Sequence, residues 1–140
     1  MLYFQDTSII IINFLIPFLI GSLIFFSAVI APTIFLILDQ QNARKFIRSI
    51  FPKLYMWSFF ISLVVAFLCL LNNKFYSMII FFISFGFLFS RQYLVKWINA
   101  VSDIKVKNKK QKKQFKILHG LSVIILISQV FCLLIINLYI

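Results

Sequence analysis

Few residues of this 140-residue chain can take part in acid–base or metal chemistry. It has three acidic residues, one histidine and two cysteines, and charged residues make up only 12% of the sequence. A lone histidine cannot supply paired axial haem ligands or the usual ligand set of a zinc site. Cys69 and Cys132 stand far apart inside apolar runs, where a thiol behaves as a small hydrophobic group. We therefore expect no metal, no cofactor and no disulfide.

Glycine and proline are also scarce, with three of each. A loop that cradles phosphate needs several closely spaced glycines, and no such cluster occurs. Serine, histidine and aspartate are present, but no nucleophile elbow accompanies them. These absences disfavour an enzyme but leave that class open.

Apolar residues are abundant instead. They make up 63% of the sequence, and phenylalanine alone accounts for 19 residues. A soluble domain of this size has too little interior to bury so much apolar surface. Lipid must therefore be part of the solvent, and the composition predicts an all-α membrane protein.

Four apolar runs are long enough to cross the bilayer, which takes roughly 20 helical residues for about 30 Å of hydrocarbon. We expect a single transmembrane domain over residues 1–140, a four-transmembrane-helix bundle with spans at residues 8–38, 53–71, 75–98 and 116–138. The first residues carry no basic segment and no small-residue cleavage site follows, so we expect no cleaved signal peptide. The turn between the second and third spans is very short, which predicts an antiparallel hairpin.

The segment between the first two spans is amphipathic. Asp39 follows the first span and is suited to cap the N-terminus of a new helix. Over residues 40–51 apolar side chains recur every three or four positions, and three basic residues fall on the opposite face: Arg44, Lys45 and Arg48. Such a helix lies in the membrane interface. We expect a short interfacial helix at 40–51, with Pro52 in the first turn of the second span.

The distribution of charge predicts an orientation. The net charge is +11, and the basic residues gather in the segment just described and in a basic loop at residues 103–116. In a four-span chain these two segments lie on one side of the membrane, and the positive-inside rule makes that side cytoplasmic. We expect a multi-pass protein of a bacterial inner membrane with both termini outside. The basic clusters fit anionic lipid headgroups, and we expect no nucleic-acid partner.

Unusual polar residues gather at the basic end of the predicted bundle. Polar groups inside membrane proteins are candidates for function because their burial is costly. We expect a polar cluster in which Asp39 or Asp103 pairs with Arg91 and His119. Three roles remain open: a structural clasp, a substrate or ion site, and side chains that reach to water. The candidate residues are Asp39, Arg91, Asn99, Asp103 and His119.

Three stretches of the sequence, GSLIFFSAVIAPTIF, RSIFP and FKILHGLS, resemble the transmembrane protein 205-like family, a family of uncharacterised proteins. The resemblance covers nearly the whole chain and implies a four-helix integral membrane protein with no established reaction. Many members have a proline after the arginine-bearing segment, whereas this chain has LVKWIN. The signature residues in this sequence are Gly21, Pro32, Phe35 and Pro52, together with Arg91 and His119.

Three functions are compatible with this pattern. The first is a non-enzymatic accessory or assembly role through helix packing, because Ser58, Ser62 and Ala66 form a ridge of small residues. The second is a small transporter or permeation unit, which needs a homo-oligomer because four helices are few for a solute path. The third is a membrane redox or haem-handling enzyme, suggested only by general likeness to other small four-helix membrane proteins.

Overall fold

The helices of the chain join into four long rods. The computed structural model describes residues 2–104 and 108–140, so Lys105 and Lys107 of the predicted basic loop lie outside the described residues. The first rod comprises α1 (Leu2–Phe25), a π-helical turn η1 (Phe26–Ile30) and α2 (Ala31–Ile37). The second is α3 (Gln40–Cys69). The third comprises α4 (Lys74–Phe89), the π-helical turn η2 (Ser90–Leu94) and α5 (Val95–Ser102), and the fourth is α6 (Lys109–Tyr139).

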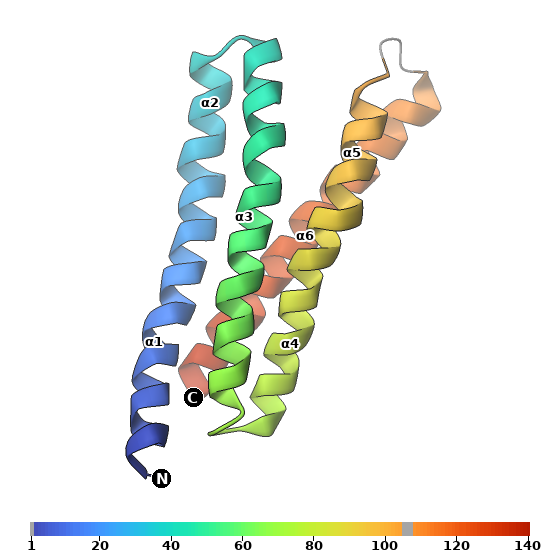
Figure 1. Cartoon of the computed structure of the whole chain (residues 1–140). Helices are drawn as coiled ribbons and strands as arrows, with labels where there is room; N and C mark the ends of the chain where they lie inside the picture. The colour runs from blue at the N-terminus through green and yellow to red at the C-terminus, as the bar shows by residue number, and fades with distance from the viewer. Residues whose placement is uncertain (1, 105–107) are drawn as a thin grey trace.

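Each rod is long and apolar enough to span a bilayer. The spanning segments are Gln5–Ile37, Gln40–Cys69, Lys74–Ser102 and Lys109–Tyr139. The predicted four-helix membrane fold is therefore confirmed. Both termini and the α3–α4 turn lie at one end of the bundle, and the α2–α3 turn lies at the other, as do the end of α5 and the start of α6 (Figure 1). The two basic segments of the sequence thus share one end, which we call the basic end.

Residues 40–51 are helical, but they do not form a separate element. Helix α3 runs without interruption from Gln40 to Cys69, and Pro52 lies inside it. The expected boundary at Pro52 is therefore absent, and the amphipathic segment is the first part of the second rod. Proline has no N–H to donate and its ring crowds the preceding turn. In an apolar environment the other backbone N–H and C=O groups can find hydrogen-bond partners only within the helix. This favours a helix that continues through the proline.

Proline is accommodated differently in the first rod. Pro32 stands at the start of α2, directly after the π-helical turn η1. A π turn contains one extra residue and widens the helix. Here it lies in the turn that the ring of Pro32 would crowd. The backbone hydrogen bonds of the first rod therefore change locally from α-helical to π-helical spacing, but the helix does not end. This continuity is what the expected single span over this region requires.

The lysine-rich run after Asn108 is also helical. The Asn108 side chain accepts from the backbone N–H of Gln111 at 2.9 Å, and the Gln111 side chain accepts from the backbone N–H of Asn108 at 3.0 Å. This reciprocal capping box fixes the start of α6. Lysines expected in a loop, from Lys109 onward, thus occupy the first two turns of the fourth rod.

The small residues of α3 face the inside of the bundle. Ser58, Ser62 and Ala66 are fully buried. The hydroxyl of Ser77 on α4 donates to the carbonyl of Ala66 at 2.7 Å, so the ridge packs against α4 within the same chain. The ridge on which the expected accessory or assembly role depends therefore packs against a neighbouring helix of the same chain.

A buried polar contact joins α6 to α4 in the half of the bundle that carries the termini. The side-chain amide of Gln129 is buried and donates to the carbonyl of Ile83 at 3.1 Å. A Cβ at Gly86 would overlap Nε2 of Gln129. Gly86 is therefore the residue that lets this amide reach the backbone of α4.

Replacing Gly86 by alanine should destabilise the fold through this contact, whereas Gly21→Ala is a matched control because a Cβ at Gly21 meets no atom within 4 Å. Both variants gain the same helix propensity, so their difference isolates the overlap. We expect Gly86→Ala to be less stable than Gly21→Ala by about 1–3 kcal/mol in mixed-micelle unfolding. Equal stabilities of the two variants, in the wild-type background, would show that the amide does not depend on Gly86.

Candidate functional site

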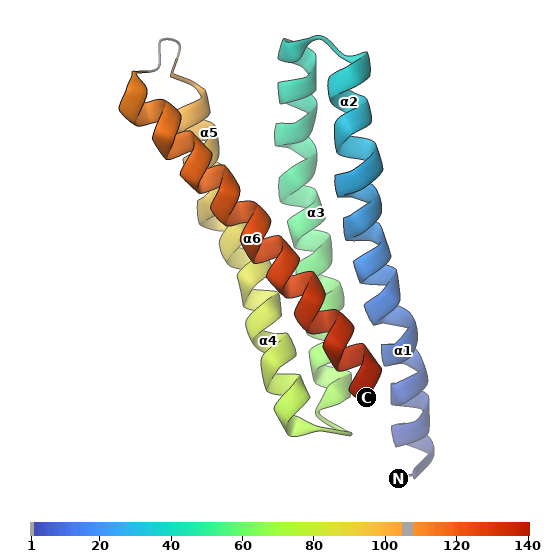
Figure 2. The same ribbon diagram turned by 180° about the vertical axis from the view of Figure 1, so that it is seen from behind.

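A cavity lies between two pairs of helices at the basic end. The α2–α3 pair and the α5–α6 pair spread apart toward this end in both views (Figures 1 and 2). The space between their side chains is a cavity of about 550 Å³. Residues of α2, α3, α5 and α6 and of both π-helical turns line it. The π turns are thus part of the wall, and π-helical insertions occur frequently at functional sites.

The inner wall of this cavity is mainly apolar. Its side chains include Ala31, Ile47, Phe51, Leu94, Ile98 and Val123. Polar groups enter at intervals, with Ser27 from η1, Asn99 and Ser102 from α5, and His119 and Ser122 from α6. An apolar cleft with a few convergent polar groups is the usual form of a small-molecule site.

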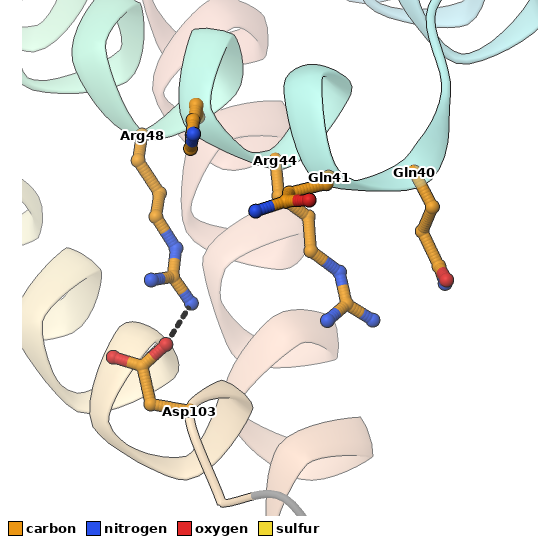
Figure 3. Close-up of a pocket in the computed structure, with 6 residues that line it drawn as sticks. Gln40, Gln41, Arg44, Arg48 and Asp103 are labelled. Atoms are coloured by element: carbon orange, nitrogen blue, oxygen red, sulfur yellow. Dashed lines mark ion pairs between the residues drawn. The ribbon is translucent and has the colours of Figure 1, made fainter.

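A second, polar pocket of about 290 Å³ adjoins the cavity. Six residues line it: Gln40, Gln41, Arg44, Lys45, Arg48 and Asp103. Three of these, Gln40, Arg44 and Arg48, also line the apolar cavity. Figure 3 shows Arg44 and Arg48 projecting from α3, with Arg48 directed at Asp103. We call the cavity and the polar pocket together the amphipathic site.

Along one face of α3 the side chains that line the site change from polar to apolar. Gln40, Arg44 and Arg48 are spaced by four residues, which places them on one side of a helix. Phe51 and Tyr55 continue that side and line the apolar cavity. Because α3 is continuous through Pro52, a single rigid element fixes the basic groups relative to the apolar wall.

An ion pair closes the polar pocket on one side. Arg48 and Asp103 are 2.5 Å apart, and their side chains are 33% and 61% exposed. The pair links α3 to the end of α5, and it is the one ion pair among residues 2–104 and 108–140. Exposed pairs of this kind contribute about 0.2–1 kcal/mol. It therefore orients the two helices more than it stabilises them.

The structure brings some of the predicted cluster together and separates the rest. Asn99 and His119 both line the cavity, and Asp103 lines the polar pocket. Asp103 pairs with Arg48, however, and not with Arg91. The third rod is continuous, so twelve residues separate Arg91 from Asp103 by about 18 Å along its axis. Arg91 lines neither pocket, and its Nε is buried without a hydrogen-bond partner.

Asp39 caps α3, as its position after the first span predicts. The side-chain amide of Asn42 donates to the Asp39 carboxylate and, with the backbone N–H groups of Asn42 and Gln41, keeps the pKa of Asp39 below its usual range. The carboxylate is thus engaged with its own helix. It lines neither pocket of the amphipathic site.

His119 presents an exposed ring at the cavity wall. Its imidazole stacks on Phe115 with a centroid separation of 6.1 Å and an interplanar angle of 2°. Phe115 lines the cavity too, so the stacked pair forms part of the α6 wall. Among the residues with a described structure no group of three or more histidine, cysteine or acidic side chains lies close enough to hold a metal ion.

The signature residues of the family resemblance occupy different environments. Phe35 lines the cavity, although 57% of it is exposed. Pro32 begins α2 after η1, Pro52 lies within α3, and Gly21 faces open space on α1. Only Phe35 among these four belongs to the wall of the amphipathic site.

The sequence pattern did not predict that Arg44 and Arg48 line the amphipathic site. The amphipathic pattern places both on the basic face of an interfacial helix and outside the predicted polar cluster. Their spacing of four residues, extended by Gln40, was the available signal, because it places three polar groups on one side of a helix. The spacing could not show that this side of the helix faces α5.

Comparison with known proteins gives one match. The family model described as "Domain of unknown function (DUF4149)" matches residues 14–107, which is 94 of the 140 residues. No curated protein and no solved structure matches the chain. The matched range contains all of α2, α3 and α5 and therefore most of the wall of the amphipathic site.

A double-mutant cycle on Arg48→Gln and Asp103→Asn should detect the ion pair. We expect a coupling free energy of about 0.2–1 kcal/mol at low salt, because the pair is partly exposed. It should shrink as salt screens the charges. The matched cycle with Arg91→Gln and Asp103→Asn should give no coupling. A larger coupling for Arg91 than for Arg48 would contradict the observed pairing.

Proposed function

We propose, for a chain that belongs to the family described as "Domain of unknown function (DUF4149)", a non-enzymatic role in which the amphipathic site binds a membrane-embedded ligand. The observation that carries the proposal is the 550 Å³ apolar cavity that shares Arg44 and Arg48 with a polar pocket. A ligand with an apolar body and a polar end matches this arrangement. Within the family, the stretches GSLIFFSAVIAPTIF, RSIFP and FKILHGLS support the transmembrane protein 205-like type.

This proposal refines the expected accessory role. Assembly through helix packing was inferred from the ridge of small residues on α3, but Ser58, Ser62 and Ala66 are buried against the chain's own α4. The open space of the bundle lies elsewhere, between α2–α3 and α5–α6. A bound ligand between these pairs is therefore better supported than a second protein at the ridge.

Transport is the second candidate, and the position of the cavity favours it. Asn99 and His119 supply polar groups inside a cavity at one end of the bundle, as an access site for a solute requires. Four helices are few for a complete path, so transport would need several copies of the chain. Flux of the bound ligand through proteoliposomes, in addition to binding, separates this candidate from a binding protein.

We propose a bacterial inner membrane as the location of the protein, and the charge distribution supports an orientation with the basic end on the cytoplasmic side. Arg44, Lys45 and Arg48 lie at the same end of the bundle as the lysines that open α6. Lys74, in the first turn of α4, lies at the opposite end. The positive-inside rule then places both termini outside.

Cysteine labelling tests this orientation. In a variant whose Cys69 and Cys132 are replaced by alanine, we expect a membrane-impermeant maleimide to label Lys74→Cys in intact cells. Gln41→Cys, which is exposed at the opposite end, should react only after the membrane is opened. The reverse pattern of labelling would invert the topology.

Filling the cavity should prevent binding. Val123 lines the cavity, whereas its neighbour Ile124 is 63% exposed and does not line it. A phosphatidylcholine with a diazirine on its acyl chain should label Ile98 in the cavity of the wild-type protein. Val123→Trp should lower this labelling, relative to labelling at the exposed Phe82, by roughly tenfold, the effect of 1.4 kcal/mol. Ile124→Trp should leave it unchanged, and equal labelling of both variants would refute binding in the cavity.

A further inference from the structure

We propose that the ligand of the amphipathic site is an anionic phospholipid of the bilayer, with its headgroup phosphate at Arg44 and Arg48 and one acyl chain between the two helix pairs. This inference rests on the proposed function, because it names the chemical class of the ligand in the same site. It follows from the charge of the polar pocket, from the order of residues along α3 and from the chemistry of the apolar wall.

The polar pocket has an excess of positive charge. Arg44, Lys45 and Arg48 line it, and Asp103 is the one carboxylate in the wall. Asp103 is already paired with Arg48, and within the described parts of the chain Arg44 forms no ion pair. A guanidinium binds phosphate oxygens through two parallel N–H donors. An anionic headgroup therefore supplies the charge that the pocket lacks.

The order of residues along α3 matches the order of groups in a lipid. Gln40, Arg44 and Arg48 come first, at the basic end, and Phe51 and Tyr55 follow toward the middle of the bundle. Arg48 belongs to both pockets, so a headgroup bound there has the apolar cavity directly beside it. Facing this stripe, Leu94 and Ile98 complete a channel for an acyl chain.

The apolar wall by itself does not select one lipid over another. The bilayer is as apolar as the cavity, so moving an acyl chain between them gains little free energy. The difference in affinity between lipids must therefore come from the headgroup. Basic pockets between transmembrane helices bind anionic headgroups for this reason.

Native mass spectrometry of the 140-residue chain in micelles measures this preference. The probes are phosphatidylglycerol and phosphatidylcholine with identical acyl chains. We expect the wild-type protein to bind phosphatidylglycerol at least about tenfold more tightly, as 1.4 kcal/mol from a charge-assisted contact gives. Arg44→Gln/Arg48→Gln should reduce this ratio to roughly one. Arg44→Gln alone, which keeps the Arg48–Asp103 pair, should lower the ratio partly and so guards against misfolding of the double variant.

The matched control is Lys112→Gln/Lys113→Gln, which removes two charges from α6 outside the lining of either pocket. We expect it to keep the preference for phosphatidylglycerol. An equal loss in this control would overturn the inference, because it would show general attraction to a basic surface. Equal binding of both lipids, with Val123→Trp still blocking acyl-chain labelling, would overturn the headgroup assignment and leave ligand binding in the cavity intact.

Discussion

The structure depends on one constraint: a backbone in hydrocarbon must satisfy its N–H and C=O groups within its own helix. Pro17, Pro32 and Pro52 would mark helix boundaries in water, yet all three lie within continuous rods. Several serine hydroxyls follow the same rule. Ser58, Ser62 and Ser84 donate to carbonyls of the preceding turn of their own helix. Each rod therefore satisfies most of its hydrogen-bonding groups internally, and few polar groups remain to join one rod to another.

These few joining contacts are unevenly distributed. In the half of the bundle that carries the termini, Asn72 donates to Ser8, Ser77 to the Ala66 carbonyl and Gln129 to the Ile83 carbonyl. At the basic end the corresponding polar contact between rods is the partly exposed pair of Arg48 and Asp103. Buried hydrogen bonds hold their geometry better than exposed ion pairs, which water and salt weaken. The helix pairs spread apart at the end where the polar contact between rods is the partly exposed one.

The number of rods and the clustering of basic residues at one end could be predicted from the sequence, because span length and charge are properties of single segments. The details that shape the site could not. The π-helical turn η2, which begins at Ser90 and contributes Leu94 to the cavity wall, has no signal in the local sequence pattern. The pairing of Asp103 with Arg48 depends on how α5 lies against α3, which no local pattern records. The helix boundary predicted at Pro52 was wrong for a related reason. The rules for helix ends come from chains whose free backbone groups water can solvate.

The continuity of α3 finally connects the fold to the site. Had the chain broken at Pro52, an interfacial helix would have lain flat and carried Arg44 and Arg48 along the membrane surface. The unbroken helix instead sets these residues in line with Phe51 and Tyr55, above an apolar cavity. Basic residues that would otherwise only fix the topology thereby become part of a pocket. The same constraint that keeps the rods intact thus places residues that signal topology in the wall of a pocket.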